Sequence, residues 1–385
     1  MIKALIYDKL RKMIIKNLEL KNFRNYRELK LQPSPGINLI LGENAQGKSN
    51  LLEALYILST SKSFRALKEE ELVSWGSSYA LVSEEVSRKD RETTIEIRWI
   101  REGDNNLKKE IMINNGPVRK IQDLLGEVTC VVFTPQNLEI VQGAPSVRRK
   151  FLDIFLSQLK PYYYRNLLDY NKVLMEKNNY LRNFKSRRET ALEDVFNEKL
   201  SLLGSAIIKE RTGMTEKLDA SASLFYNYLS GVEEKVGINY ICSIPLNGNL
   251  PLEDSYLQHL GKIRELELER CAALAGPHRD DLKILLSEKE ARVYGSQGQH
   301  RTIALSLKLA QKEIFLKETG EEPVVMLDDA LSELDEAHQR NLLKKIRQNG
   351  QSFITSAHWN NSIIPIEEVE CFKIKEGKLD LCSLL

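Results

Sequence analysis

The segment from Gly42 to Ser49 carries residue types that could hold a chain of phosphates. Its sequence, GENAQGKS, fits the pattern GxxxxGK[ST], follows an apolar run at 37–41 and precedes a helical pattern at 50–58. Glycines let backbone N–H groups converge on phosphate oxygens, and a helix N-terminus adds partial positive charge. We expect Lys48 to bind the outer phosphates of ATP and the Ser49 hydroxyl to help hold Mg²⁺. The predicted contacts are Gly42, Glu43, Asn44, Ala45, Gln46, Gly47, Lys48 and Ser49.

A phosphate-binding loop of this kind also needs a carboxylate at the end of a buried strand, and residues 324–329 offer two. Four apolar residues are followed by Asp328 and Asp329. We expect Asp328 to hold Mg²⁺ and Asp329 to orient or deprotonate the attacking water. Paired acids in this position could instead simply cap the following helix.

The distance between these two elements indicates a large insertion. About 280 residues separate Lys48 from Asp328, far more than a minimal βαβ nucleotide-binding fold requires. Just before the acids, residues 294–301 read YGSQGQHR, which resembles the SxGQ signature of ABC-type ATPases. That resemblance implies that Ser296, Gly298 and Gln299 receive the γ-phosphate bound by a second subunit. The alternative is a flexible Gly/Gln linker.

The elements that must position these residues change in character along the chain. The first third is rich in strand patterns, whereas the middle reads as long helices with a kink at Pro161. Strands are predicted near 14–21, 37–41, 79–86, 93–100, 109–113, 128–133, 282–286, 324–327 and 353–355, and helices within 146–216, 254–274 and 297–318. The fold class is therefore α/β.

Composition fits a globular protein without membrane spans. The chain has 385 residues, 42% of them hydrophobic and 29% charged. No run of 18 apolar residues occurs, and the five scattered cysteines match neither a disulfide framework nor a zinc site. We therefore expect a cytoplasmic protein with no membrane contact. The first 12 residues precede Met13 and could be an extension or an over-long gene start.

Net charge is only +2, but its distribution is uneven. Between Arg148 and Arg188 there are eleven Lys/Arg and three acidic residues. This segment could bind DNA phosphates or could be a solvated helical face. Arg148 and Arg149 are the individual candidates for DNA contact.

Several further segments narrow the resemblance. The chain resembles the RecF family of ABC/SMC-type ATPases from about residue 13 almost to its end. SELD at 332–335 resembles the D-loop of ABC-type ATPases, and NFRNY at 22–26 resembles the start of an SMC-type head. The segments that resemble RecF itself are SKSFR at 61–65, FTP at 133–135, GAP at 143–145 with Arg148 and Arg149, and LAGPHRDD at 274–281.

This resemblance implies an SMC-head-like P-loop ATPase with two lobes. The ATPase lobe, with a mixed sheet, would combine residues 13–145 with residues 291–385. A mainly helical lobe would be inserted at 146–290.

The family resemblance also implies an activity and partners. The protein would dimerise on ATP, bind double-stranded DNA near gaps, and help load the recombinase RecA together with RecR and RecO in recombinational repair and replication restart. ATP hydrolysis would be weak, stimulated by DNA, and would serve as a reset.

The resemblance carries over to three more residues. Arg24 matches an SMC-head position that approaches the nucleotide, although a surface ion pair is the alternative. Gln136 would be the Q-loop glutamine, with Gln142 as its competitor. His358 would be the switch histidine near the γ-phosphate. A transporter ATPase or a P-loop phosphotransferase remains the alternative function.

Overall fold

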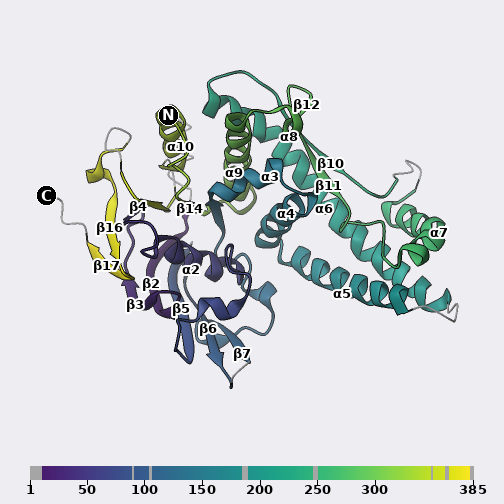
Figure 1. The fold of residues 1–385 in the computed structure, drawn as a ribbon, viewed down its shortest axis with the longest axis horizontal. Helices are drawn as coiled ribbons and strands as arrows, with labels where there is room; N and C mark the ends of the chain where they lie inside the picture. The colour runs from purple at the N-terminus through teal and green to yellow at the C-terminus, as the bar shows by residue number, and fades with distance from the viewer. Residues whose placement is uncertain are drawn as a thin grey trace. The chain divides into compact units, whose positions relative to one another are not determined.

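The computed structural model describes residues 11–88, 91–103, 106–183, 190–245, 250–347, 350–359 and 364–381 (Figure 1). The chain forms two compact units. Unit 1 comprises Met1–Asn137, Phe225–Glu233 and Ala304–Leu385, and unit 2 comprises Leu138–Leu224 and Glu234–Ile303. In the described part of the chain, no helix has both the length and the apolar character needed to cross a bilayer.

The central sheet of unit 1 has the order β17-β16-β4-β15-β14-β9. All neighbours are parallel except β16 and β17, so the sheet is mixed, as predicted. Its strands are β4 (Ile37–Leu41), β9 (Cys130–Phe133), β14 (Val324–Asp328), β15 (Ser352–Ser356), β16 (Glu370–Lys375) and β17 (Lys378–Leu381). β4, β9, β14 and β15 are almost wholly buried, which explains why they read as continuous apolar runs. In Figure 1 the yellow β16 runs beside the purple β4, although the two come from opposite ends of the chain.

The second sheet of unit 1 is antiparallel, with the order β3-β2-β5-β6-β7-β8. Its strands are β2 (Ile14–Phe23), β3 (Tyr26–Leu31), β5 (Tyr79–Arg88), β6 (Arg91–Arg101), β7 (Leu107–Ile113) and β8 (Gly116–Pro117). The alternating patterns predicted four of these strands. Asn114 and Asn115 form the turn between β7 and β8, and both have positive φ. β3 was missed because its sequence, YRELKL, is half charged.

Helix α2 (Lys48–Thr60) packs against strands of both sheets. Eleven of its 13 residues are buried, so it has no polar face. The remaining elements of unit 1 are β1 (Arg11–Lys12), β13 (Glu321–Glu322), α10 (Glu336–Arg347) and the short helices η1 (Glu69–Leu72), η2 (Ile121–Asp123), η3 (Pro135–Leu138) and η4 (Ile366–Glu368).

Unit 2 is mainly helical, as predicted. Its elements are α3 (Glu139–Gln142), α4 (Pro145–Leu159), α5 (Pro161–Asn183), α6 (Thr190–Ser230), α7 (Leu252–Arg270) and α8 (Ala291–Tyr294), with the small sheet β10 (Val236–Ile241), β11 (Asp281–Leu286) and β12 (Lys289–Glu290). The predicted kink at Pro161 is a full break between α4 and α5. Helix α9 (Gln297–Thr319) begins in unit 2 and ends in unit 1.

The unit boundaries differ from the predicted domain limits of 145/146 and 290/291. Unit 2 begins at Leu138 and continues to Ile303, because α3 packs against α4 and α8. The last turns of α6 belong to unit 1. There, the Asn341 side chain donates to the Tyr228 carbonyl oxygen at 3.2 Å, and the Lys345 ammonium lies 4.7 Å from the Tyr228 ring centroid.

Candidate nucleotide-binding site

The phosphate loop lies between β4 and α2, as its sequence predicts. Both of its glycines are needed for steric reasons. Gly47 has φ +114°, and a Cβ there would lie 2.6 Å from the Asn25 amide nitrogen. A Cβ on Gly42 would lie 2.5 Å from the Ile374 carbonyl oxygen. Neighbouring segments therefore surround the loop closely and hold its backbone in place.

The NFRNY segment at 22–26 makes hydrogen bonds to the phosphate loop. The Asn25 amide donates to the Gln46 carbonyl oxygen at 2.9 Å and accepts from the Asn50 amide at 2.9 Å. The Tyr26 hydroxyl donates to the Gly47 carbonyl oxygen at 3.0 Å, and burial raises the pKa of Tyr26. This segment was recognised only by its resemblance to a family, and the contacts show what its polar residues do.

The β16–β17 turn supports the loop from the C-terminal end of the chain. The Glu376 N–H donates to the Gln46 side-chain oxygen at 2.6 Å, and the Gly377 N–H donates to the Gln46 carbonyl oxygen at 3.3 Å. Sequence reasoning missed this contact, because nothing in the local sequence of β16 and β17 points to a loop more than 300 residues away.

Lys48 occupies the interior of its own loop. Its ammonium donates to the carbonyl oxygens of Gly42 at 2.6 Å and Glu43 at 2.8 Å. Burial lowers the pKa of Lys48, and the nearby carboxylates of Asp329 and Asp328 oppose that shift. The Lys48 ammonium is thus bonded to two neutral carbonyl oxygens. Phosphate oxygens could replace them and would bind the ammonium more strongly, because they are negatively charged.

The two elements predicted to cooperate meet directly. The Ser49 hydroxyl donates to Asp328 Oδ1 at 2.6 Å. Asp328 is buried at the end of β14, and Asp329 is exposed just beyond it with φ +50°. The acids therefore do not merely cap α10, which begins only at Glu336. A hydroxyl and a carboxylate oxygen are the hard donors that Mg²⁺ prefers, so these residues fit that ion.

Gln136 and His358 both follow strands of the central sheet. Gln136 is exposed in η3, immediately after β9, and His358 is exposed two residues after β15. Because β9, β14, β15 and β4 are parallel, both residues lie beyond the same edge of the sheet as the phosphate loop and the acids. Within the described residues, neither side chain is hydrogen-bonded to Asp328 or Asp329, so their catalytic roles stay predictions.

The competitor Gln142 has a different partner. Its amide lies 2.6 Å from His300 Nδ1, and His300 Nε2 lies 2.6 Å from the Ala291 carbonyl oxygen. The carbonyl can only accept, so His300 Nε2 carries the proton and Nδ1 accepts from Gln142. Gln142 thus helps to fix the turn that precedes α9.

The SxGQ segment forms the start of α9 and is not a flexible linker. The Ser296 N–H donates to the Gln299 side-chain oxygen at 2.9 Å, and the Gln299 N–H donates to the Ser296 hydroxyl oxygen at 3.2 Å. This reciprocal arrangement is a capping box. Gly298 is exposed, and a Cβ there would meet nothing within 4 Å. The segment belongs to unit 2, and the phosphate loop belongs to unit 1.

Arg24 makes an ion pair, which was the alternative to nucleotide contact. Its guanidinium donates to both carboxylate oxygens of Glu53 at 2.8 and 2.9 Å, and to Glu71 at 3.5 Å. The Glu53 side chain is fully buried on α2. Burial acts to lower the pKa of Arg24, but these two carboxylates outweigh it and raise that pKa. Glu53 is therefore the main partner of Arg24 in this structure.

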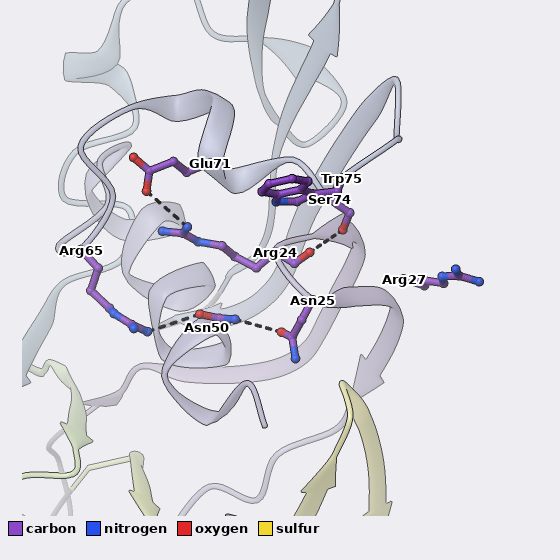
Figure 2. A pocket seen from close by; sticks show the side chains of 8 residues that line it. All are labelled: Arg24, Asn25, Arg27, Asn50, Arg65, Glu71, Ser74 and Trp75. Carbon is purple, nitrogen blue, oxygen red and sulfur yellow. Dashed lines mark hydrogen bonds and ion pairs between the residues drawn. The ribbon is translucent and has the colours of Figure 1, made fainter. Parts of the chain in front are cut away.

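A cavity of about 590 Å³ opens beside this ion pair (Figure 2). In Figure 2 the Arg24 side chain extends toward Glu71, and Asn50 lies between Arg65 and Asn25. The cavity is lined by Arg24, Asn25, Arg27, Asn50, Arg65, Glu71, Ser74 and Trp75. Its lining contains three arginines and one acidic residue, and Arg24 is already paired with Glu53 and Glu71.

Arg148 contradicts its predicted role as a DNA contact. It is 4% exposed, and its guanidinium makes a bidentate pair with Asp281 at 2.7 and 2.9 Å. Arg149 is half-buried and donates to the Asp280 carbonyl oxygen at 2.7 Å. Both arginines hold α4 to the GPHRDD segment, and the buried Arg148 is therefore not available to a DNA backbone. A DNA contact by Arg149 stays a prediction.

The basic segment from Arg148 to Arg188 is less available than its composition suggests. Lys160 pairs with Glu210, and Lys177 is buried against Glu267. Lys185, Arg187 and Arg188 lie outside the described residues. The exposed basic residues that remain are Lys150, Arg165, Lys172 and Arg182.

Comparison with known proteins agrees with this geometry. Residues 14–376 match the family model described as "RecF/RecN/SMC N terminal domain". The chain is 40% identical to DNA replication and repair protein RecF of Clostridium novyi, over 96% of this chain and 100% of that protein. It is 36% identical to the Bacillus subtilis protein of the same name, over 95% and 100%.

Solved structures give the same result. The structure described as the recombination mediator protein RecF with ATP in the RecFOR pathway superimposes with a TM-score of 0.88 at 39% identity, covering 97% of this chain and 98% of that one. The Smc head domain of Pyrococcus furiosus superimposes with a TM-score of 0.56 at 16% identity, covering 97% and 96%, and shares the fold alone. With both the sequence and the structure matched over nearly their full length, this chain belongs to the RecF family of SMC-head-type ATPases.

Proposed function

We propose that this protein is an ATP-dependent DNA-binding protein of recombinational repair and replication restart. The observation that carries the proposal is the contact of Ser49 with Asp328, which joins the phosphate loop to the acidic strand in one site. Support comes from relatives of matching length named for DNA replication and repair, and from a recombination mediator protein RecF whose structure was solved with ATP.

Different residues of this site would bind the phosphates, hold Mg²⁺ and activate the attacking water. Loop N–H groups from Gly42 to Ser49 and the Lys48 ammonium would bind the phosphates. Ser49 and Asp328 would hold Mg²⁺, which supplies charge neutralisation at the phosphates when bound. Asp329, exposed next to this pair, would orient the attacking water and accept its proton. Gln136 and His358 are proposed to complete the site from the neighbouring strand ends.

Assembly would complete the site across two copies of the chain. Ser296, Gly298 and Gln299 stand at an exposed helix N-terminus, which favours a bound phosphate. We propose that they contact the nucleotide held by the loop of a second copy, so that ATP stabilises a homodimer. Hydrolysis would release that dimer.

DNA is the proposed macromolecular partner, as duplex and at gaps. RecR-like and RecO-like proteins are the proposed protein partners, with RecA an indirect one, because relatives are described as members of the RecFOR pathway. Contacts to DNA would be mainly to phosphates and carry little base specificity. A protein acting on the bacterial chromosome would work in the cytoplasm. A transporter or phosphotransferase function is not favoured by any full-length relative named above.

The test is ATP hydrolysis measured with and without DNA. We expect slow hydrolysis that rises on addition of gapped duplex DNA and disappears in Lys48→Ala. A gel-shift series with gapped, single-stranded and duplex DNA in ATP would identify the preferred form. If none of the three kinds of DNA changes the rate of ATP hydrolysis, the proposal that DNA stimulates hydrolysis is wrong.

A further inference from the structure

Thr355 lies between the two halves of the nucleotide-binding site. It is on β15, which stands between the phosphate-loop strand β4 and the acidic strand β14. In the sheet register Thr355 is opposite Ile40 on one side and opposite Asp328 on the other. Its residue is 1% exposed, so its hydroxyl must find its partners within the protein.

The hydroxyl of Thr355 contacts both acidic residues. Its oxygen lies 3.0 Å from Asp328 Oδ1 and accepts from the Asp329 N–H at 3.0 Å. A hydroxyl has one proton, and donating it to the carboxylate leaves the oxygen lone pairs for the N–H. The Leu327 carbonyl oxygen is a more distant acceptor at 3.3 Å. One side chain thus holds a carboxylate and the next backbone amide at once.

The first of these bonds fixes the side chain of Asp328, and the second fixes the backbone of Asp329. Asp328 Oδ1 accepts from Ser49 and Thr355 together, and Oδ2 accepts no hydrogen bond within the described residues. The rotamer is therefore set with one oxygen free for a cation or its water. Asp329 has φ +50°, a left-handed conformation that is uncommon for a residue with a side chain. The bond to Thr355 stabilises that conformation and so directs the Asp329 side chain.

We infer that Thr355 is a positioning residue for ATP turnover, holding Asp328 and Asp329 in the arrangement that hydrolysis requires. This inference rests on the proposed hydrolysis at this site. Thr355 does not belong to the phosphate loop, so its hydroxyl would affect turnover rather than nucleotide binding. Serine can make both bonds, whereas valine has nearly the same shape and can make neither.

The test compares Thr355→Val and Thr355→Ser, with Thr129→Val as the matched control. Thr129 is also 1% exposed, and its hydroxyl has no hydrogen-bond partner among the described residues. We expect Thr355→Val to lower kcat about tenfold or more with KM for ATP within about twofold, and Thr355→Ser to stay within about threefold of the parent protein. Thr129→Val should keep the parent kcat.

A second readout uses the protein without nucleotide. Hydrogen–deuterium exchange of the peptide containing Asp329 should be faster in Thr355→Val and unchanged in Thr355→Ser and Thr129→Val. If Thr355→Val does not fold, Thr355→Ala removes the same hydroxyl and is measured in the same way.

Three results would overturn the inference: kcat of Thr355→Val equal to that of the control, Thr355→Ser as slow as Thr355→Val, or unchanged exchange at Asp329. If the parent protein hydrolyses no ATP, the proposed function fails, and the exchange measurement still decides whether Thr355 holds Asp329.

Discussion

The Ser49 hydroxyl lies 2.6 Å from Asp328 Oδ1, although 279 positions separate the two residues in the sequence. The contact exists because β4 and β14 are both parallel to β15, which lies between them. Parallel strands end at the same edge of a sheet, so the residues that follow them converge there. Unit 1 thereby assembles both halves of one site from opposite ends of the chain.

Replacing Lys48 with alanine should weaken ATP binding at least about tenfold, because the β- and γ-phosphates lose the cation of the loop. Equilibrium binding of a fluorescent ATP analogue measures this. Lys62→Ala is the control, since Lys62 is exposed two residues beyond the end of α2. Equal affinity of Lys48→Ala and Lys62→Ala would remove Lys48 from the site.

Asp329→Asn should keep nucleotide binding and lower turnover by about 10²-fold or more, because an amide can hold the water but cannot take its proton. Asparagine tolerates the left-handed conformation seen at this position, so the melting temperature should not change. Single-turnover hydrolysis with saturating ATP is the measurement. Parent-like turnover in this variant would show that another group is the base.

Ser296→Arg should abolish ATP-dependent dimerisation and spare ATP binding by the monomer, because a bulky side chain fills the place proposed for the phosphate held by the partner. Arginine also removes the helix cap seen with Gln299, worth about 1 kcal/mol. Ser296→Asp separates the two effects, since aspartate caps a helix well and repels phosphate.

Sedimentation with ATP should show monomers for both Ser296 variants. Mixing Ser296→Arg with Lys48→Met should yield some heterodimer, because one composite site then keeps an intact loop and an intact signature. Dimerisation of Ser296→Asp as strong as that of the parent would argue against contact in trans.

DNA affinity should depend on the exposed basic residues of unit 2 and not on Arg148. Neutralising Lys150, Arg165, Lys172 and Arg182 should reduce the slope of log affinity against log salt concentration, because fewer counterions are released. Arg148→Ala should instead lower the melting temperature, because it leaves Asp281 without its bidentate partner. If the fourfold variant keeps the parent slope, DNA binds elsewhere.

Stability should fall as pH rises because of Glu84. This residue is buried in β5, neither carboxylate oxygen has a hydrogen-bond partner among the described residues, and burial raises its pKa to about 8. The unfolded chain ionises Glu84 near its ordinary pKa of 4.5 while the folded chain keeps the proton. The free energy of unfolding therefore declines between about pH 4.5 and pH 8.

Glu84→Gln should remove this contribution and raise stability at pH 8 relative to pH 5. Denaturant unfolding at the two pH values measures it. Glu85→Gln, on the exposed side of the same strand, should leave the pH dependence unchanged. An equal pH dependence in Glu84→Gln and the parent would show that Glu84 is ionised in the folded protein.

The sequence by itself determined the parts of the site that depend on a short stretch of chain. GENAQGKS after an apolar run predicted a strand, loop and helix, and the structure has them in that order. VVMLDD predicted a buried strand ending in acids, and SQGQ became a helix start because a Ser–Gln capping box needs only four residues. Backbone conformation, burial pattern and capping are local properties, so they can be read from neighbouring residues.

Only the tertiary structure decided which charged and polar groups meet. Arg148 was a candidate DNA contact because it lies in a basic segment, yet Asp281, 133 positions away, neutralises it. The sequence left open whether Arg24 approaches the nucleotide or forms an ion pair, and the fold places it against Glu53 on α2. The sequence marks Thr355 only as part of a short buried strand, and the pairing of β15 with β14 is what places its hydroxyl beside Asp328. The strength of an ion pair or hydrogen bond depends on distance and burial, and folding sets both for residues far apart in the sequence.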